Sequence, residues 1–158
     1  MQKITPFLWF NDNAEEAIEM YTGIFKNSEI GHKVYNNGSM PGAKGSLFTA
    51  TFWLEGQQFM ALNGGPMFSF SPAISLFVNC ETQEEVDELW EKLSAGGQQQ
   101  RCGWLQDKFG VSWQIIPSAL QRLIYVQDAQ QAKRVMDAML QMNKMDIAKL
   151  EEAARMDH

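Results

Sequence analysis

The first half of the chain alternates between extended apolar segments and one segment with helical spacing. Ile4–Phe10 is β-branched and aromatic and is followed by the turn-prone sequence NDN, which predicts a strand. Asn13 is a candidate N-cap, and apolar residues recurring every three or four positions behind it predict a helix over residues 14–25. Further strands are predicted at residues 30–35, 46–54 and 57–63. The pattern therefore predicts the order βαβββ.

The second half repeats this order after a loop. The loop, residues 63–72, is interrupted by glycines and prolines and is the candidate crossover between the halves. Residues 73–79 predict a strand, and Thr82 with Glu85 forms a capping box before a helix that ends at a glycine pair. Strands are then predicted at about residues 98–102, 104–107 and 111–116.

The two halves align with each other at fixed offsets. One offset carries Leu8 onto Leu76 and Ile18 onto Val86, so core positions of the first strand and the helix coincide. Another carries Met60 onto Gln114 in the last strand of each half. We therefore predict an α+β fold of two tandem βαβββ modules, at residues 1–65 and 72–117, within a domain spanning 1–126.

The chain beyond Pro117 has helical spacing. Met136, Met139 and Leu140 form a stripe, which we interpret as a packing face belonging to a lid or dimer element. Residues 127–158 are accordingly predicted to be a C-terminal helical extension of the same domain.

Charge and composition exclude several classes of function. The formal net charge is −6 and no local basic patch is present, so nucleic acid is not an expected partner. No run of about 18 apolar residues predicts a membrane span, and the first residues lack signal-peptide order. Cys80 and Cys102 form no CxxC motif, which favours a reducing cytoplasm.

Three sequence motifs resemble those of one superfamily. The opening PFLWFNDNAEEAIEMY, the crossover ALNGGP and the late CGWLQDKFGVSWQIIP, on a duplicated βαβββ order, resemble the vicinal oxygen chelate superfamily of glyoxalases, bleomycin-resistance proteins and extradiol dioxygenases. The resemblance is greatest to its PhnB-like branch, labelled 3-demethylubiquinone-9 3-methyltransferase, and extends over nearly the whole chain, the C-terminal helices included. It implies that the modules pair into a curved, eight-stranded mixed sheet around a cavity.

The resemblance also indicates where a metal would bind. Metal-dependent members carry His, Gln or Glu on the first and last strands of each module, and the corresponding residues here are Thr5, Pro6, Phe7, Ala73, Ile74, Ser75, Met60 and Gln114. None offers imidazole, carboxylate or thiolate, so we expect no metal and no cofactor. The two histidines, His32 and His158, are expected at the surface.

Strand alternation, taken with the resemblance, predicts a ligand-binding surface. Met60 and Gln114 should point inward, because their neighbours Phe59 and Trp113 should face the helices. The predicted surface comprises Phe7, Trp9, Met60, Ser75, Phe77 and Gln114, with Trp53 and Trp104 at its rim. Such a surface suits an aromatic or apolar organic molecule, although the same side chains would equally fill an interior without any ligand.

These residues leave more than one function open. A homodimeric, metal-free binding protein is favoured, in the manner of bleomycin-resistance proteins. The alternative is an isomerase, lyase or transferase of the superfamily with a modified active site. A third possibility is an interaction protein that uses its dimer surface and C-terminal helices. No catalytic residue is assigned, because Glu55, Glu81 and Asp107 all lie beside turns or a helix start, where we expect solvated carboxylates or helix-end charges.

Overall fold

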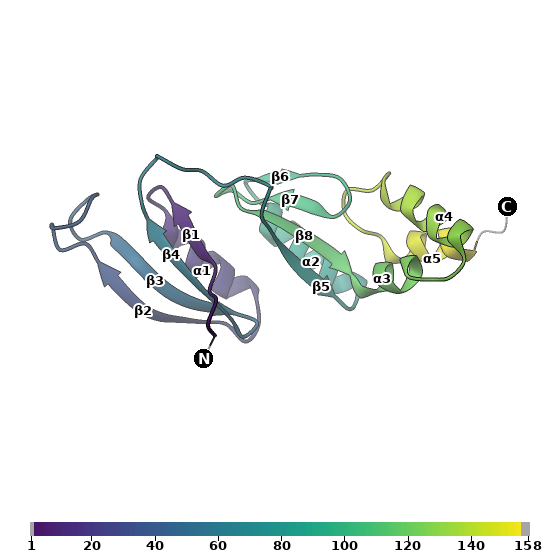
Figure 1. Cartoon of the computed structure of the whole chain (residues 1–158), viewed down its shortest axis with the longest axis horizontal. Coiled ribbons are helices and arrows are strands. Elements are labelled where there is room, and N and C mark those ends of the chain that lie inside the picture. The colour runs from purple at the N-terminus through teal and green to yellow at the C-terminus, as the bar shows by residue number, and fades with distance from the viewer. Residues whose placement is uncertain (1, 156–158) are drawn as a thin grey trace. The chain divides into compact units, whose positions relative to one another are not determined.

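A computed structural model describes residues 2–155 of the chain. The chain divides after Phe70 into two compact units, which we call unit 1 and unit 2 and describe separately. Unit 1 contains β1 (Phe7–Phe10), α1 (Ala14–Ile24), β2 (Glu29–Tyr35), β3 (Leu47–Leu54) and β4 (Gln57–Asn63), which are labelled in Figure 1. Unit 2 contains β5 (Ser75–Cys80), α2 (Gln83–Ser94), β6 (Gln98–Gln99), β7 (Trp104–Gln106), β8 (Ser112–Pro117), α3 (Ser118–Ile124), α4 (Ala129–Met139) and α5 (Ile147–Arg155).

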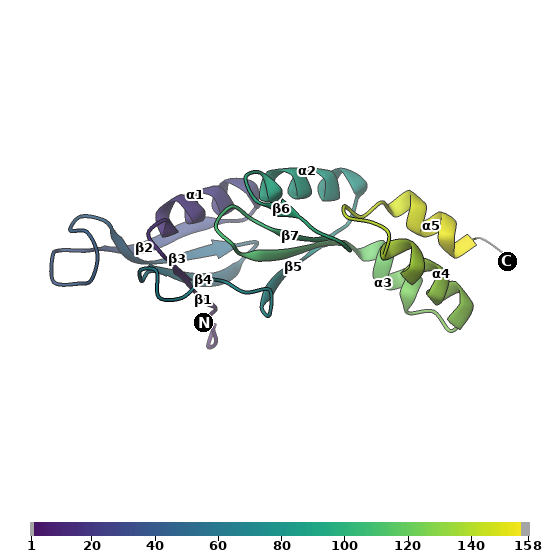
Figure 2. The ribbon, with the colours of Figure 1, turned by 90° about the horizontal axis from the view of Figure 1, so that it is seen from above.

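The sheet of unit 1 has four strands in the order β1-β4-β3-β2. β1 runs parallel to β4, and the other neighbours are antiparallel. Figure 2 shows α1 lying along one face of this sheet. The side chains between helix and sheet include Ile18, Tyr21, Phe10, Phe52 and Phe59, all buried. This alternation, with every second strand residue buried, defines a helix-covered face and an open face.

Unit 2 repeats the arrangement with the strand order β5-β8-β7-β6. β5 is parallel to β8, and β7 is antiparallel to both of its neighbours. Figure 2 shows α2 lying along one face of this sheet. Trp113, Ile115 and Leu105 of the sheet and Val86 and Leu93 of the helix are buried. The α+β fold of two tandem βαβββ modules with C-terminal helices is thus confirmed. Its eight strands are hydrogen-bonded as two four-stranded mixed sheets that are not closed.

The C-terminal helices α3, α4 and α5 pack on one another and on the rest of unit 2 through a small apolar core. Val135, Met145 and Leu150 are fully buried. Val135 makes the inward contact of α4, whereas Met136 and Leu140 are 38% and 47% exposed in the single chain, so their assignment to a lid or dimer element stays a prediction. In residues 2–155, no helix has the length and apolar character needed to cross a bilayer.

Two local details differ from the sequence predictions. The Asn13 side chain makes no cap to α1; the backbone N–H of Ala14 donates instead to Asn63 Oδ1 at the end of β4, at 2.8 Å. The strand predicted at 98–102 ends at Gln99, because Cys102 and Gly103 adopt positive φ angles of 61° and 81° and turn the chain back into β7. Thr82 caps α2 as predicted, accepting from Glu85 N at 3.2 Å.

Candidate functional site

The open face of unit 1 carries four of the predicted site residues. Phe7 lies opposite Met60 across β1 and β4, and Trp53 lies opposite Gln58 across β3 and β4. Paired residues point to the same side of a sheet and side chains alternate along a strand, so Phe7, Trp9, Trp53 and Met60 share this face. Their neighbours Phe59 and Ala61 are buried on the α1 side.

Trp9 is tied to the chain segment that follows β4. Its indole Nε1 donates to the carbonyl of Gly65 at 3.0 Å, and the Phe68 ring meets its ring edge-on, with centroids 5.0 Å apart. A Cβ on Gly64 would overlap the Trp9 indole, so only glycine permits this approach. The only polar atom of the Trp9 side chain is therefore already hydrogen-bonded within unit 1, a role that sequence spacing did not reveal.

Trp53 is also closely packed within its own unit. A Cβ on Gly31 of the neighbouring β2 would come within 2.6 Å of Trp53 Cζ3, so the indole lies over the Gly31 backbone. Phe7 is different, because 48% of its side chain is exposed. Of the aromatic residues on this face, Phe7 therefore has the most surface left for another molecule.

The open face of unit 2 carries the other four predicted residues. Gln114 on β8 lies directly between Phe77 on β5 and Trp104 on β7 in the strand register. Its Nε2 donates to Ser75 Oγ at 2.9 Å. Trp104, which was expected at the rim of the surface, lies on β7 directly beside Gln114. Phe77 is 46% exposed.

This face of unit 2 is uncharged along its three longer strands. Register and alternation place eight residues on this side of the sheet, none of which is ionisable: Ser75, Phe77, Asn79, Trp104, Gln106, Ser112, Gln114 and Ile116. Of these, Ser112 and Ile116 are buried, and the other six are at least partly exposed. An ionised ligand would find no opposite charge in the face itself, and a charge removed from water without a partner is costly.

The residues at the superfamily's metal-binding positions do not fit a metal. Met60 offers a thioether, and the Gln114 carboxamide is already engaged with Ser75. Neither is a strong ligand for zinc or a first-row transition ion. Throughout the described part of the chain, no three His, Cys, Asp or Glu side chains are grouped so as to hold a metal ion. His32 is exposed, and His158 lies outside the described residues.

Asp107 was expected to be a solvated carboxylate beside a turn, but it is buried, because donors of its own turn surround it. Cys80 is buried as well. Asp107 accepts hydrogen bonds from the backbone of Phe109 and Val111 and, at 2.9 Å, from the indole Nε1 of Trp113. It therefore closes the β7–β8 turn. Burial, followed by the nearby carboxylate of Glu85, raises the pKa of the Cys80 thiol to about 12. Cys80 is thus a protonated thiol at neutral pH and a poor nucleophile.

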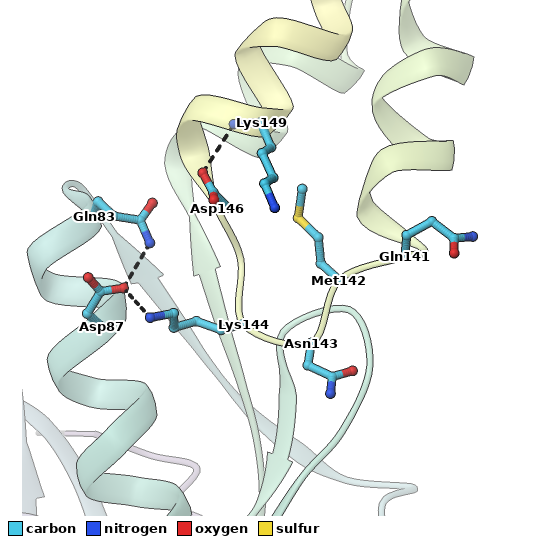
Figure 3. Close-up of a pocket in the computed structure, with 8 residues that line it drawn as sticks. All are labelled: Gln83, Asp87, Gln141, Met142, Asn143, Lys144, Asp146 and Lys149. Atoms are coloured by element: carbon cyan, nitrogen blue, oxygen red, sulfur yellow. Dashed lines mark hydrogen bonds and ion pairs between the residues drawn. The ribbon is translucent and has the colours of Figure 1, made fainter.

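A polar groove of about 410 Å³ lies between the start of α2 and the α4–α5 connection (Figure 3). Gln83 spans it: Nε2 donates to the Met145 carbonyl at 2.9 Å, and Oε1 accepts from Ile147 N at 2.8 Å. Asp87 Oδ1 forms an ion pair with Lys144 Nζ at 2.9 Å. The Gln83 hydrogen bond, then the Lys144 contact, holds the pKa of Asp87 below its usual value. No sequence motif marked this groove, and its contacts fasten α5 to α2.

Comparison with known proteins identifies the family. A model of the family described as 3-demethylubiquinone-9 3-methyltransferase matches residues 2–116. The chain belongs to this family. The family match ends at Ile116, before α3 begins, so the C-terminal helices that the sequence resemblance included lie beyond it. A comparison with curated protein sequences gave no significant match.

Solved structures agree with the family assignment. A PhnB protein from Bacillus cereus is 42% identical, with a TM-score of 0.70, and the match covers 74% of this chain and all of that one. Protein PA1353 from Pseudomonas aeruginosa is 22% identical over 74% of this chain and 98% of that one, with a TM-score of 0.61. A fosfomycin resistance protein, FosX, from Listeria monocytogenes, solved with Mn(II), is 18% identical over 72% and 90%, with a TM-score of 0.52. The chain therefore shares its fold with proteins of much lower sequence identity, among them this fosfomycin resistance protein.

Proposed function

We propose that this protein binds a small, uncharged aromatic or apolar organic molecule on the open faces of its sheets, without a metal. The observation that carries the proposal is the open face of unit 2, where a carboxamide stands between two aromatic side chains on a surface without charge. Ligand sites of this kind combine apolar walls with a few oriented polar groups. The half-exposed rings of Phe7 and Phe77 supply apolar surface that a ligand would cover.

Binding is favoured over catalysis because of the state of the candidate acids and nucleophiles. Asp107 is enclosed by hydrogen-bond donors of its own turn, and Cys80 is a buried thiol whose pKa is about 12. Neither is on an open face. The methyltransferase activity in the family description would require S-adenosylmethionine, and the connection from β1 to α1 has no glycine that could approach a cofactor. Calorimetric binding of S-adenosylmethionine would favour that activity instead.

The proposal includes a homodimer in the cytoplasm. Large apolar side chains are exposed on and beside the open faces, and a second copy would cover part of them. Cys80 and Cys102 are both free thiols, as is usual in a reducing compartment. Sedimentation equilibrium measures the assembly directly, and a monomer at micromolar concentration would contradict this part of the proposal.

The binding function is tested with a neutral probe and a metal assay. Isothermal titration with 2-methoxynaphthalene should show saturable binding, weakened about tenfold in Phe77→Ala because an aromatic contact is lost. Ile74→Ala is the control, since Ile74 is 79% exposed and lies outside the sheet. The purified protein should carry far less than one transition-metal ion per chain. Stoichiometric metal, or no binding of neutral aromatic probes, would contradict the proposal.

A further inference from the structure

The Gln114 side chain is oriented by a neighbour on the adjacent strand. In the register of β5 and β8, Gln114 lies opposite Phe77, and Ser75 is two residues before Phe77 on the same face. This diagonal position lets Gln114 Nε2 donate to Ser75 Oγ at 2.9 Å. Within residues 2–155, the Gln114 side chain makes this one hydrogen bond. Its direction fixes which end of the carboxamide faces Ser75.

The remaining groups of the carboxamide can both accept and donate. With one Nε2 hydrogen given to Ser75, the second hydrogen and Oε1 are still available. A group that both donates and accepts, such as a hydroxyl, satisfies them together. An ether oxygen can only accept, so it would leave Oε1 without a donor and remove it from water at a cost.

The surroundings of Gln114 define the rest of the ligand. Phe77 and Trp104 occupy the neighbouring strands on either side, about 5 Å away as strand spacing requires. A flat ring placed over Gln114 therefore contacts an aromatic side chain on each side. Because the face carries no ionisable residue on β5, β7 or β8, a charged ligand would lack a counter-charge there.

We infer that the open face of unit 2 selects an uncharged aromatic molecule bearing a hydroxyl group, with Gln114 as the recognition residue and Ser75 as the residue that positions it. This inference rests on the proposed function and specifies the class of its ligand.

The test compares three probes that share one ring system: 2-naphthol, 2-methoxynaphthalene and 2-naphthoate. At pH 7 they present a hydroxyl, an ether and a carboxylate. Titration calorimetry on the full chain should give 2-naphthol an affinity about five- to tenfold above that of the ether, with 2-naphthoate weakest. Gln114→Met should remove the preference for the hydroxyl while retaining ring binding. Ser75→Ala should reduce that preference, and Ser75→Thr, which keeps the hydroxyl, should retain it.

Gln57→Met is the matched control, because it makes the same change at an exposed position of β4 in unit 1. Its preference for 2-naphthol should equal that of the wild type. Equal affinities of the wild type for naphthol and ether, or a preference that survives Gln114→Met, would overturn the inference while leaving the binding function intact. Failure of all three probes to bind would overturn the binding function as well. The wild-type comparison decides the matter even if a variant does not fold.

Discussion

Asp107 shows how one buried carboxylate can organise a turn. The residue is 2% exposed, and its two oxygens accept from two backbone amides and from the indole of Trp113. Trp113 is itself a core residue beneath α2. The β7–β8 turn and the core of unit 2 are thus joined through a single side chain, and β8 is the strand that presents Gln114.

Replacing this carboxylate tests its structural role. Asp107→Asn keeps one acceptor oxygen but places an NH2 group where a donor now approaches, so a buried hydrogen bond is lost and two donors face each other. We expect the free energy of unfolding to fall by about 2–3 kcal/mol. Chemical denaturation measures the change. Asp137→Asn is the control, since Asp137 is exposed and forms a surface ion pair with Lys133, and it should cost less than about 0.5 kcal/mol. Equal losses in the two variants would contradict the structural role.

At the scale of elements, the C-terminal helices depend on a small number of polar contacts with α2. Gln83, in the first turn of α2, bonds to the backbone on both sides of Asp146. The connection from α4 to α5 is also held by the turn before β7. There, the backbone N–H groups of Cys102 and Gly103 donate to the carbonyls of Met142 and Asn143, each at 2.8 Å. These contacts hold the buried Met145 against unit 2.

Removing the Gln83 side chain should loosen α5 selectively. In Gln83→Ala, Ile147 N loses its acceptor and the Met145 carbonyl loses its donor. Hydrogen exchange followed by mass spectrometry should therefore show faster exchange in residues 145–155, by about tenfold, with little change in the sheet of unit 2. Gln130→Ala, at an exposed position of α4, serves as the matched control and should exchange like the wild type. Uniform acceleration across unit 2 would show that Gln83 supports the whole unit.

The order of elements could be predicted from sequence because it depends on local patterns. The alternation of apolar and polar residues predicted the strands, and the N-cap residue Thr82 predicted the start of α2. Long-range partners could not be predicted in this way. Asn13 has the chemistry of a cap, but the donor at the start of α1 is satisfied by Asn63, which is distant in the sequence. The same limit applies to the site: alternation placed Gln114 and Phe77 on one face, whereas the hydrogen bond between Trp9 and Gly65 follows from tertiary packing.

At the scale of the whole molecule, the chain has two units, each with its own sheet and its own buried core. Phe52 fills the core of unit 1, and Leu105 fills that of unit 2; both are fully buried. The two βαβββ modules have similar cores, each formed between one helix and one face of a four-stranded sheet. Their open faces differ, because Met60 stands in unit 1 where Gln114 stands in unit 2.

Because the two cores are separate, a core substitution in one unit should destabilise mainly that unit. Phe52→Ala should remove about 3–5 kcal/mol and Leu105→Ala about 2–5 kcal/mol from the stability of the unit that contains it. In hydrogen exchange, Phe52→Ala should accelerate exchange mainly in residues 2–70, and Leu105→Ala mainly in residues 71–155. The two variants control for each other. Equal acceleration in both units by either variant would show that the chain unfolds as a single cooperative body.

The bonds made by Gln83 also connect the region that matches the family to the helices beyond it. Gln83 lies inside the region that matches the family, whereas its partners Met145 and Ile147 lie beyond the end of that match. The match with the Bacillus cereus PhnB protein includes all of that protein but only 74% of this chain. A helical appendage can therefore be joined to an existing module through a residue of that module. In this chain, position 83 consequently supports two parts at once: the first turn of α2 and the attachment of the helices that follow the family match.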